Sequence, residues 1–306
     1  MATKDESGRV YVTGASGRLG RSVLARLPDA VPLVRKASGL RGELITDFSP
    51  DSLRGILRDA KAVIHLAGLI GPADEKRMKD ANVSLTWRIV DSLPRGSKAV
   101  FASSISVYGK KPAEIPASEK TRTAPDSAYA RTKLDAEKIV ARHPKHCILR
   151  IGTLYGPQFD DYFLILRKIE RGKMKIIGNG SNRIPFAHVD DVAGAIANAV
   201  ERGSGIYVLA GEPLTQQRIY EIAARELGVN APAKHIGSGL AMLAALFSEK
   251  LKMSPTTREH IAVLASDRAF DCRKAREELG FSPRPLEDGI REMVRAYRET
   301  AKSAKV

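Results

Sequence analysis

Tyr129 and Lys133 are the two residues whose types and spacing best suit acid–base chemistry. They stand four positions apart in a stretch of helical composition, so their Cβ atoms would lie about 5–6 Å apart on one helix face. A free phenol has a pKa near ~10 and exchanges protons poorly at neutral pH. A neighbouring ammonium favours the phenolate and lowers that pKa, which would make Tyr129 a general acid/base. The same spacing also arises by chance, as a surface tyrosine beside a solvated lysine.

A glycine-rich turn near the start of the chain has the context of a dinucleotide-binding loop. Residues 9–13 are strand-like, Gly14, Gly17 and Gly20 follow, and residues 21–27 have helical composition. A strand, a glycine turn and a helix allow close backbone approach to a pyrophosphate at the helix N-terminus. The spacing is G-x-x-G-x-x-G rather than the commoner G-x-G-x-x-G. A flexible surface loop is the competing interpretation.

The end of the second expected strand, residues 31–34, indicates which nicotinamide cofactor would bind. An acidic residue about 20 positions past the first glycine binds the ribose 2′-hydroxyl, whereas an arginine accommodates a 2′-phosphate. This chain has Arg35 there, and Arg18 is a second cation in the glycine loop. We therefore expect NADP(H) to be favoured, with NAD(H) left open.

Strand-like and helical segments alternate from residue 9 to about residue 151, which predicts an α/β fold with a parallel sheet covered on both faces. Later strands are expected at residues 62–65, 98–102, 146–151 and 205–209, and helices at about 74–93, 126–142 and 190–202. The expected organisation is a polar tail (1–8), a Rossmann-like doubly wound core (9–151), and a smaller C-terminal substrate-binding region interleaved with the last sheet elements (152–306).

Segments spread over nearly the whole chain match the motifs of one known family in that family's order. They are residues 13–20, Asp47, 65–68, Asn82, 101–109, 149–157 and 274–283. On these motifs the chain resembles the extended short-chain dehydrogenases/reductases, the NAD(P)-dependent epimerase/dehydratase family, in a variant similar to hydroxysteroid dehydrogenases and flavonol-type reductases. The resemblance implies an enzyme that transfers a hydride at a secondary alcohol or ketone carbon.

The resemblance also implies roles for individual residues. Ser104 would orient the substrate oxygen toward Tyr129, while Lys133 would lower the tyrosine pKa and hold the nicotinamide ribose. Ser103 and Ser106 are interpreted as strand and turn hydroxyls, with direct participation of Ser103 left open. Cofactor contacts are expected from Gly14, Ser16, Gly17, Arg18, Leu19, Gly20, Arg35, Asp47, Phe48, Leu66, Ala67, Gly68, Asn82, Tyr129, Lys133 and Ile151. Substrate contacts are expected from Ile70, Ser106, Thr153 and Arg183.

The substrate is expected to be a sugar nucleotide or an apolar secondary alcohol. The family's 4,6-dehydratases carry an Asp-Glu pair where this chain has Ile105 and Ser106, so dehydration is disfavoured. Nucleotide-sugar enzymes often have an asparagine in place of Thr153, and an arginine one position further along than Arg183. Both differences favour the hydroxysteroid-like relatives. A nucleotide-sugar epimerase with no net redox, and a non-catalytic nucleotide sensor or structural subunit, are the two alternatives.

Two further segments each allow two interpretations. The apolar residues 240–247 could wall an apolar pocket, or form a helix buried beneath the C-terminal region. His188, Asp190 and Asp191 could contact substrate, but an acidic N-cap of the following helix explains the aspartates better.

Composition limits the partners and the location. The 306 residues carry a formal charge of +15, but the cations are dispersed, so a solvated surface is expected and no specific nucleic-acid binding. The polar start lacks the apolar segment of a signal peptide, and no window approaches the ~20 apolar residues of a membrane span, which together predict a cytoplasmic protein. Cys147 and Cys272 suit packing, and no metal site is expected. A homodimer is left open.

Overall fold

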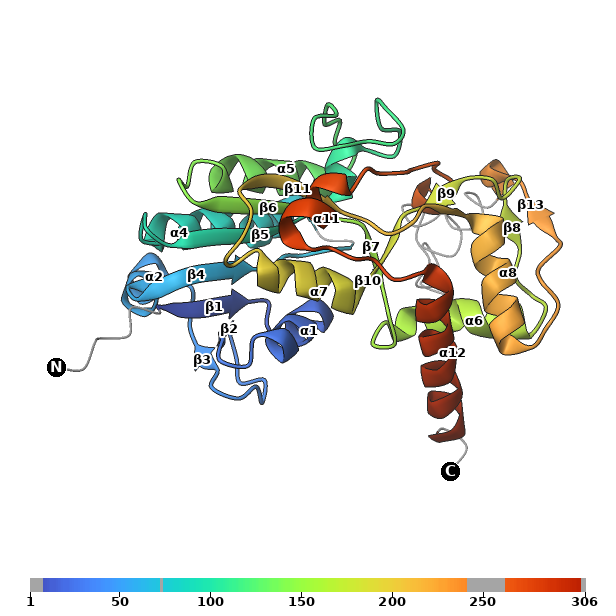
Figure 1. Ribbon diagram of the computed structural model, residues 1–306, viewed down its shortest axis with the longest axis horizontal. Helices are drawn as coiled ribbons and strands as arrows, with labels where there is room; N and C mark the ends of the chain where they lie inside the picture. Colours follow the sequence, from blue (N-terminus) through green and yellow to red (C-terminus); the bar gives the residue numbers. More distant parts are fainter. Residues whose placement is uncertain (1–7, 72–73, 241–261, 304–306) are drawn as a thin grey trace.

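The computed structural model describes residues 8–71, 74–240 and 262–303, and its centre is a seven-stranded parallel sheet (Figure 1). The strand order is β11-β6-β5-β4-β1-β2-β3. The strands are β1 (Arg9–Thr13), β2 (Val31–Val34), β3 (Leu44–Ile45), β4 (Ala60–His65), β5 (Lys98–Ser104), β6 (His146–Ile151) and β11 (Gly205–Leu209). The predicted Rossmann-like, doubly wound α/β class is confirmed.

Helices cover both faces of this sheet (Figure 1). One face packs against α1 (Arg18–Arg26), α7 (Val189–Asn198) and α11 (Arg273–Leu279), and the other against α2 (Pro50–Leu57), α4 (Leu85–Ser92) and α5 (Ala128–Val140). Successive side chains of a strand point to opposite faces, so Tyr11 packs with the second group and Val12 with the first. Burial on both faces explains why these strands are apolar runs rather than alternating ones.

The strand order reverses beside β1. The chain runs outward from β1 through β2 to β3 on one side, and from β4 through β5 and β6 to β11 on the other. In open parallel sheets, ligands bind at such a reversal, in the crevice outside the carboxyl ends of the strands. The glycine turn, the segment after β4 and Ser104 all follow carboxyl ends here.

Several strand boundaries match the prediction, whereas the helix boundaries differ from it, most clearly in two helices. The strands expected at residues 9–13, 31–34, 146–151 and 205–209 have those bounds. Helix α1 begins at Arg18, three residues earlier than expected, because Gly17 is its extended N-cap. The helix expected over 74–93 is instead α3 (Glu75–Lys79), a π turn η1 (Asp80–Ser84) and α4.

The C-terminal region has its own core beside the sheet domain. Its short strands pair as β7 (Thr153–Tyr155) with β10 (Phe186–His188), β9 (Arg183–Ile184) with β12 (Leu214–Thr215), and β8 (Ile176–Ile177) with β13 (His235–Ile236). Its core includes the described helices α6 (Phe163–Glu170), α8 (Gln216–Leu227) and α12 (Leu286–Ser303). The described residues also contain the 3₁₀ helices η2 (Ile105–Tyr108) and η3 (Asp160–Tyr162). Apolar side chains of α6, α8 and α12 form one buried cluster.

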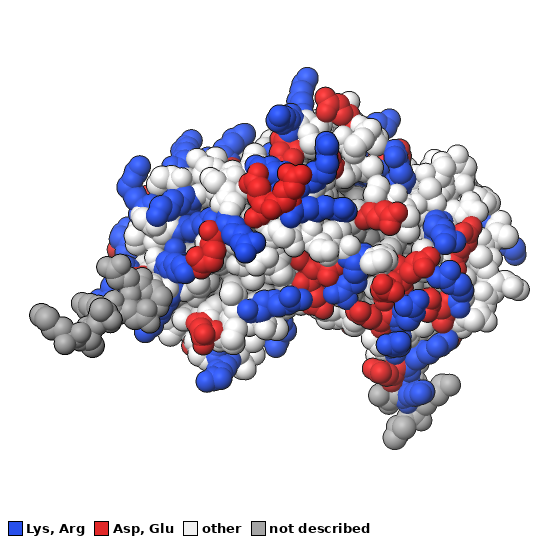
Figure 2. Space-filling view, viewed as in Figure 1, with Lys and Arg blue, Asp and Glu red and all other residues white. Residues whose placement is uncertain are grey.

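Some expectations fall partly outside the described residues, namely those for the tail (1–7) and for the apolar segment (241–247). Within the described ranges, no helix has both the length and the hydropathy needed to cross a membrane. Figure 2 shows Lys and Arg side chains spread over the visible face, with Asp and Glu among them. The expected packing role of Cys147 and Cys272 is confirmed, because both are free and buried.

Candidate active site

Ser104, Tyr129 and Lys133 come together at the carboxyl end of β5. Ser104 is the last residue of β5, and its hydroxyl lies close enough to Tyr129 to affect the pKa of that phenol. Helix α5 begins just before Tyr129, capped by the Ser127 Oγ, which accepts the N–H of Ala130 at 3.1 Å. The Lys133 Nζ lies one turn further along this helix. The two elements thus bring the three predicted residues to one place.

Burial controls the electrostatics of this group. Lys133 is 5% exposed, and its Nζ donates to the Ala102 carbonyl at 2.5 Å and lies 4.2 Å from the centroid of the Phe101 ring. Loss of solvation lowers the pKa of Lys133 to about 7, against the opposing charge of Glu137. Burial raises the pKa of Tyr129 to about 12, and the hydrogen bond with Ser104 only partly offsets this. The pKa of Tyr129 is therefore raised in this structure rather than lowered as expected, because desolvation outweighs the other influences on the phenol.

Ser103 belongs to a buried ionic network rather than to the Ser104–Tyr129 pair. Its Oγ donates to the Glu137 Oε1 at 2.5 Å. Arg150 donates to both oxygens of that carboxylate, at 3.0 Å from Nε and 2.8 Å from Nη2. Its Nη1 donates to the Tyr108 hydroxyl at 2.8 Å, which in turn donates to the Ser118 carbonyl. These contacts support the interpretation of Ser103 as a structural hydroxyl.

The glycine loop has the shape that a dinucleotide requires. A Cβ on Gly14, where φ is +68°, would lie 2.6 Å from the Ala67 nitrogen, and one on Gly20 would lie 2.3 Å from the Gly14 oxygen. The turn therefore packs backbone against backbone, beside the carboxyl end of β4. No side chain caps α1, and its first turn carries no acidic residue, so Ser16 and the exposed Gly17 precede uncapped helix N–H groups. Such groups bind pyrophosphate.

The two cations expected near the cofactor have different surroundings. Arg18, half-exposed, forms ion pairs with Asp160 at 2.8 Å and Asp161 at 2.6 Å, both from η3. Arg35 is exposed, and its guanidinium lies 6.0 Å from the centroid of the Phe48 ring. Arg18 thus has carboxylate partners within the protein, whereas Arg35 faces solvent beside an aromatic ring.

The other residues expected at the cofactor line the sheet edge or support it. Asp47 is exposed, and its carboxylate accepts the Ser49 N–H at 2.9 Å. The Asn82 side chain is buried and holds the segment after β4, because its Oδ1 accepts the Leu69 N–H at 2.6 Å and its Nδ2 donates to Thr132 at 3.0 Å. The remaining residues lie near the carboxyl ends of three strands. Leu19 is in α1, the helix that follows β1, while Leu66, Ala67 and Gly68 follow β4 and Ile151 ends β6.

The four residues expected to contact substrate lie in different surroundings, and no contact between them is seen among the described residues. The Ser106 Oγ is buried two residues after Ser104 and has no hydrogen-bond partner. Ile70 is 75% exposed. Thr153 begins β7 and is half-buried, and the Arg183 guanidinium pairs with Asp267 at 2.7 Å.

The N-cap of α7 differs from the expectation. His188, not an aspartate, is the cap, and its Nδ1 accepts the Asp190 N–H at 3.3 Å. Asp190 instead accepts the hydroxyl of Ser22, and Asp191 pairs with Arg284 at 2.8 Å. Burial lowers the pKa of His188, which favours the neutral ring that a cap acceptor needs.

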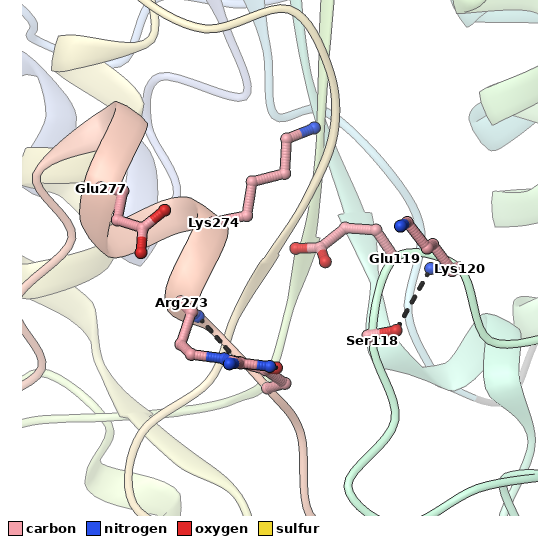
Figure 3. Close-up of a pocket in the computed structure, with 7 residues that line it drawn as sticks. Ser118, Glu119, Lys120, Arg273, Lys274 and Glu277 are labelled. Carbon is pink, nitrogen blue, oxygen red and sulfur yellow. Dashed lines mark hydrogen bonds and ion pairs between the residues drawn. The ribbon is translucent and has the colours of Figure 1, made fainter.

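A separate cavity of about 300 Å³ lies away from these residues (Figure 3). Figure 3 shows Glu119 and Lys120, on the loop after η2, facing Arg273 and Lys274 of α11. Glu119 accepts the N–H of Val208, and Lys274 donates to the carbonyl of Ile206. Two side chains that line this cavity therefore bond the free edge of β11, and none of the predicted site residues lines the cavity.

The sequence reasoning missed the partners of the predicted residues. Glu137 stands four positions after Lys133 and eight after Tyr129, so helix spacing alone puts it on their face. Arg150 is a charged residue inside the otherwise apolar β6, a pattern that indicates a buried partner. No sequence signal marks Asp160 and Asp161 as partners of Arg18.

Comparisons with known proteins show the family to which this chain belongs. The model of the NAD dependent epimerase/dehydratase family matches residues 10–210. The Sinorhizobium fredii protein y4nG is 29% identical over 89% of this chain and 74% of its own length. The Arabidopsis thaliana 3beta-hydroxysteroid-dehydrogenase/decarboxylase isoform 1 is 23% identical over 94% of this chain and 79% of its own.

A solved structure extends the likeness over the whole fold. MoeE5 in complex with UDP-glucose and NAD has a TM-score of 0.75 and 26% identity, and the match covers 96% of this chain and all of MoeE5. The described chain and this structure share the sheet and the smaller C-terminal region. The chain belongs to the NAD dependent epimerase/dehydratase family, and it is an NAD(P)-dependent oxidoreductase or epimerase.

Proposed function

We propose that this enzyme transfers a hydride reversibly at a secondary alcohol or ketone carbon, with Ser104, Tyr129 and Lys133 as its catalytic residues. The observation that carries this proposal is the placement of Tyr129 beside Ser104 at the carboxyl end of β5, with Lys133 one helical turn further along α5. A hydroxyl donor, a proton carrier and a cation suffice for alcohol–ketone interconversion. The presence of Ser104, Tyr129 and Lys133 together argues against a non-catalytic nucleotide sensor.

The glycine loop and the first turn of α1 fit a nicotinamide dinucleotide. The backbone of residues 14–20 would hold the pyrophosphate, and Lys133 would hold the nicotinamide ribose. When bound, the nicotinamide supplies the acceptor or donor of the hydride. The protein supplies the placement of the reacting carbon and the path of the proton.

The side chains can divide the proton chemistry as follows. The Ser104 hydroxyl would donate to the substrate oxygen and aim it at the Tyr129 hydroxyl. Because the pKa of Tyr129 is raised to about 12, the phenol is protonated at neutral pH and ready to donate in the direction of ketone reduction. In the direction of alcohol oxidation, the phenolate must form, and the charge of Lys133 would favour it.

NADP(H) is proposed as the preferred cofactor. Arg35 is exposed at the end of β2, and guanidinium–phosphate contacts are charge-assisted. Arg18 contributes less, because Asp160 and Asp161 already pair with it. The structure of MoeE5 holds NAD, which keeps NAD(H) as the competing choice.

A dehydrogenase or reductase acting on an apolar secondary alcohol is favoured over an epimerase. Ile105 and Ser106 follow the proposed catalytic serine, and Arg183 is paired with Asp267 rather than free for a diphosphate. A nucleotide-sugar epimerase is the second candidate, supported by the likeness to MoeE5 in complex with UDP-glucose. The two differ in whether the ketone leaves or is reduced again on its other face.

Product analysis separates the two candidates. The enzyme is incubated with NADP⁺ or NAD⁺ and with either nucleotide sugars or apolar secondary alcohols, while cofactor absorbance and product stereochemistry are followed. Stoichiometric cofactor reduction by the alcohols supports the proposal. Inversion of a sugar carbinol with no net cofactor change would establish the epimerase instead.

A further inference from the structure

Three residues of α5 contact three successive residues of β5. Tyr129, Lys133 and Glu137 are spaced by four, so they form one stripe along the helix. Tyr129 lies beside the Ser104 side chain, and Lys133 donates to the carbonyl of Ala102. Glu137 accepts the Ser103 hydroxyl at 2.5 Å. The proposed catalytic pair therefore continues into a third, unassigned position of the same stripe.

Glu137 is a buried carboxylate with every contact satisfied by the protein. It is 4% exposed, as is Arg150, which donates to both of its oxygens. Buried carboxylates occur in proteins where a cation and hydrogen-bond donors compensate for the loss of water, as Arg150 and Ser103 do here. The network thus keeps a full negative charge one turn from Lys133, in a place that water does not screen.

The groups that face Lys133 from β4, α5 and β5 are neutral, which leaves Glu137 as the nearby negative charge among the described residues. From β4, His65 faces Lys133, and its pKa falls to about 3, so the ring is neutral. From α5, Tyr129 is a neutral phenol. From β5, Lys133 meets the Phe101 ring and a backbone carbonyl, and on β6 the guanidinium of Arg150 lies beyond Glu137.

We propose that Glu137 is a positioning residue that keeps the buried Lys133 ammonium protonated and directed at the carboxyl end of β5. This inference rests on the proposed function of Tyr129 and Lys133. Burial disfavours the charged form of Lys133, and Glu137 is the carboxylate that counters it. The Ser103 hydroxyl and Arg150 hold the carboxylate in the protein interior, one helical turn from Lys133, rather than in solvent.

A purely structural role would make a different prediction. Buried ion pairs are often replaceable by apolar groups with little loss of stability. If Glu137 served only to fasten α5 to β6, then removing either partner of the pair would have the same consequence for Lys133. If its charge acts on Lys133, then removing the carboxylate and removing the guanidinium must act in opposite directions.

The test titrates Lys133 directly by NMR in the full-length protein labelled with carbon-13 at the lysine Cε. The Lys133 signal is identified by its loss in Lys133→Met. We expect a wild-type midpoint near pH 7, and a midpoint lower by about one unit or more in Glu137→Gln. Arg150→Met, the matched variant, should leave the midpoint unchanged or higher. An unchanged midpoint in Glu137→Gln, or equal shifts in both variants, overturns the proposal.

A second comparison covers the case in which Glu137→Gln does not fold. Arg150→Met is then compared with the double variant Arg150→Met/Glu137→Gln, which differs only in the carboxylate and leaves no unpaired charge. The double variant should titrate Lys133 at lower pH, and equal midpoints contradict the inference. Because the readout is lysine ionisation, it stands even if Tyr129→Phe shows that the proposed chemistry is wrong.

Discussion

The charged residues near the proposed catalytic site and the charged pairs of the C-terminal region are held in different ways. In the sheet domain, Lys133, Glu137 and Arg150 are at most 5% exposed, and their bonds run to neighbouring strands. In the C-terminal region, Arg183 and Arg284 pair with Asp267 and Asp191 while 37% and 25% of their side-chain surface stays exposed. Exposed pairs contribute about 0–1 kcal/mol, whereas breaking a buried pair costs about 3–5 kcal/mol. We therefore expect the proposed catalytic frame to be the more rigid half and the proposed substrate region the more adaptable one.

The largest effect should come from the proton carrier in the rigid half. Tyr129→Phe removes only a hydroxyl, so turnover should fall by roughly 10²–10⁴-fold while cofactor binding survives. Steady-state kinetics and cofactor titration measure the two effects. Tyr297→Phe is the control, because its hydroxyl bonds Glu170 in the C-terminal region and should leave turnover near the wild-type value. Wild-type turnover in Tyr129→Phe would remove this residue from the mechanism.

The neighbouring hydroxyls should differ in the same assay. Ser104→Ala should slow turnover by roughly 10²-fold, because the substrate oxygen loses its donor. Ser103→Ala removes a bond to Glu137 and should act on stability instead, measured by denaturant unfolding. The reverse pattern would move the catalytic role to Ser103.

Gly14→Ala should show how tightly the glycine turn packs. The added Cβ would meet the Ala67 nitrogen at 2.6 Å, and φ is +68°. The matched control is Gly39→Ala, with a φ of +73° and no atom within 4 Å of the added Cβ. Both should lose about 1 kcal/mol of unfolding free energy from the backbone conformation. Gly14→Ala alone should lose further unfolding free energy beyond this amount, and it should also lose cofactor binding. Equal losses of unfolding free energy in the two variants would contradict close packing of the turn.

Arg35→Ala should reduce the affinity for NADP(H) by about tenfold, as expected for the loss of one charge-assisted contact. The affinity for NAD(H) is the internal control and should stay unchanged. Titration of both cofactors into both proteins measures this difference. An NAD(H) preference in the wild type would contradict the proposal that NADP(H) is the preferred cofactor.

The smallest effect should come from the adaptable half. Arg183 holds the pKa of Asp267 below its usual value, mainly through a side-chain hydrogen bond. Because the pKa of Asp267 is lower in the folded than in the unfolded protein, its ionised carboxylate stabilises the fold at any pH above the unfolded pKa of about 3.9. This stabilisation is lost as the pH falls through the pKa of the folded protein. Asp267→Asn should therefore cost at most about 1 kcal/mol at pH 7, and nothing in strong acid. A larger loss of unfolding free energy in Asp267→Asn at pH 7 would contradict the expected difference between the two halves.

The sequence predicts the sheet half well because its signals are local. The strands at residues 146–151 and 205–209 are apolar runs with clear bounds, and a four-residue spacing suffices to pair Tyr129 with Lys133. The pKa of Tyr129 was predicted in the wrong direction, because desolvation depends on what the fold buries around the phenol.

The C-terminal half depends on contacts that no local pattern carries. Strands such as β9 and β12 have two residues each, too few to show periodicity. The partner of Arg183 is 84 positions away, and the partners of Arg18 more than 140 positions away, so spacing gives no warning of them. The π turn η1 interrupts a segment with helical composition throughout.

The central claim is hydride transfer at a carbinol carbon, and the fate of that hydrogen tests it most directly. A substrate accepted in the product assay is prepared with deuterium on its carbinol carbon, and cofactor, product and water are analysed by mass spectrometry. We predict that the label passes to the nicotinamide, or returns to the substrate carbon in an epimerase, without exchange into water. Release of the label to solvent would contradict hydride transfer and point to proton abstraction from carbon.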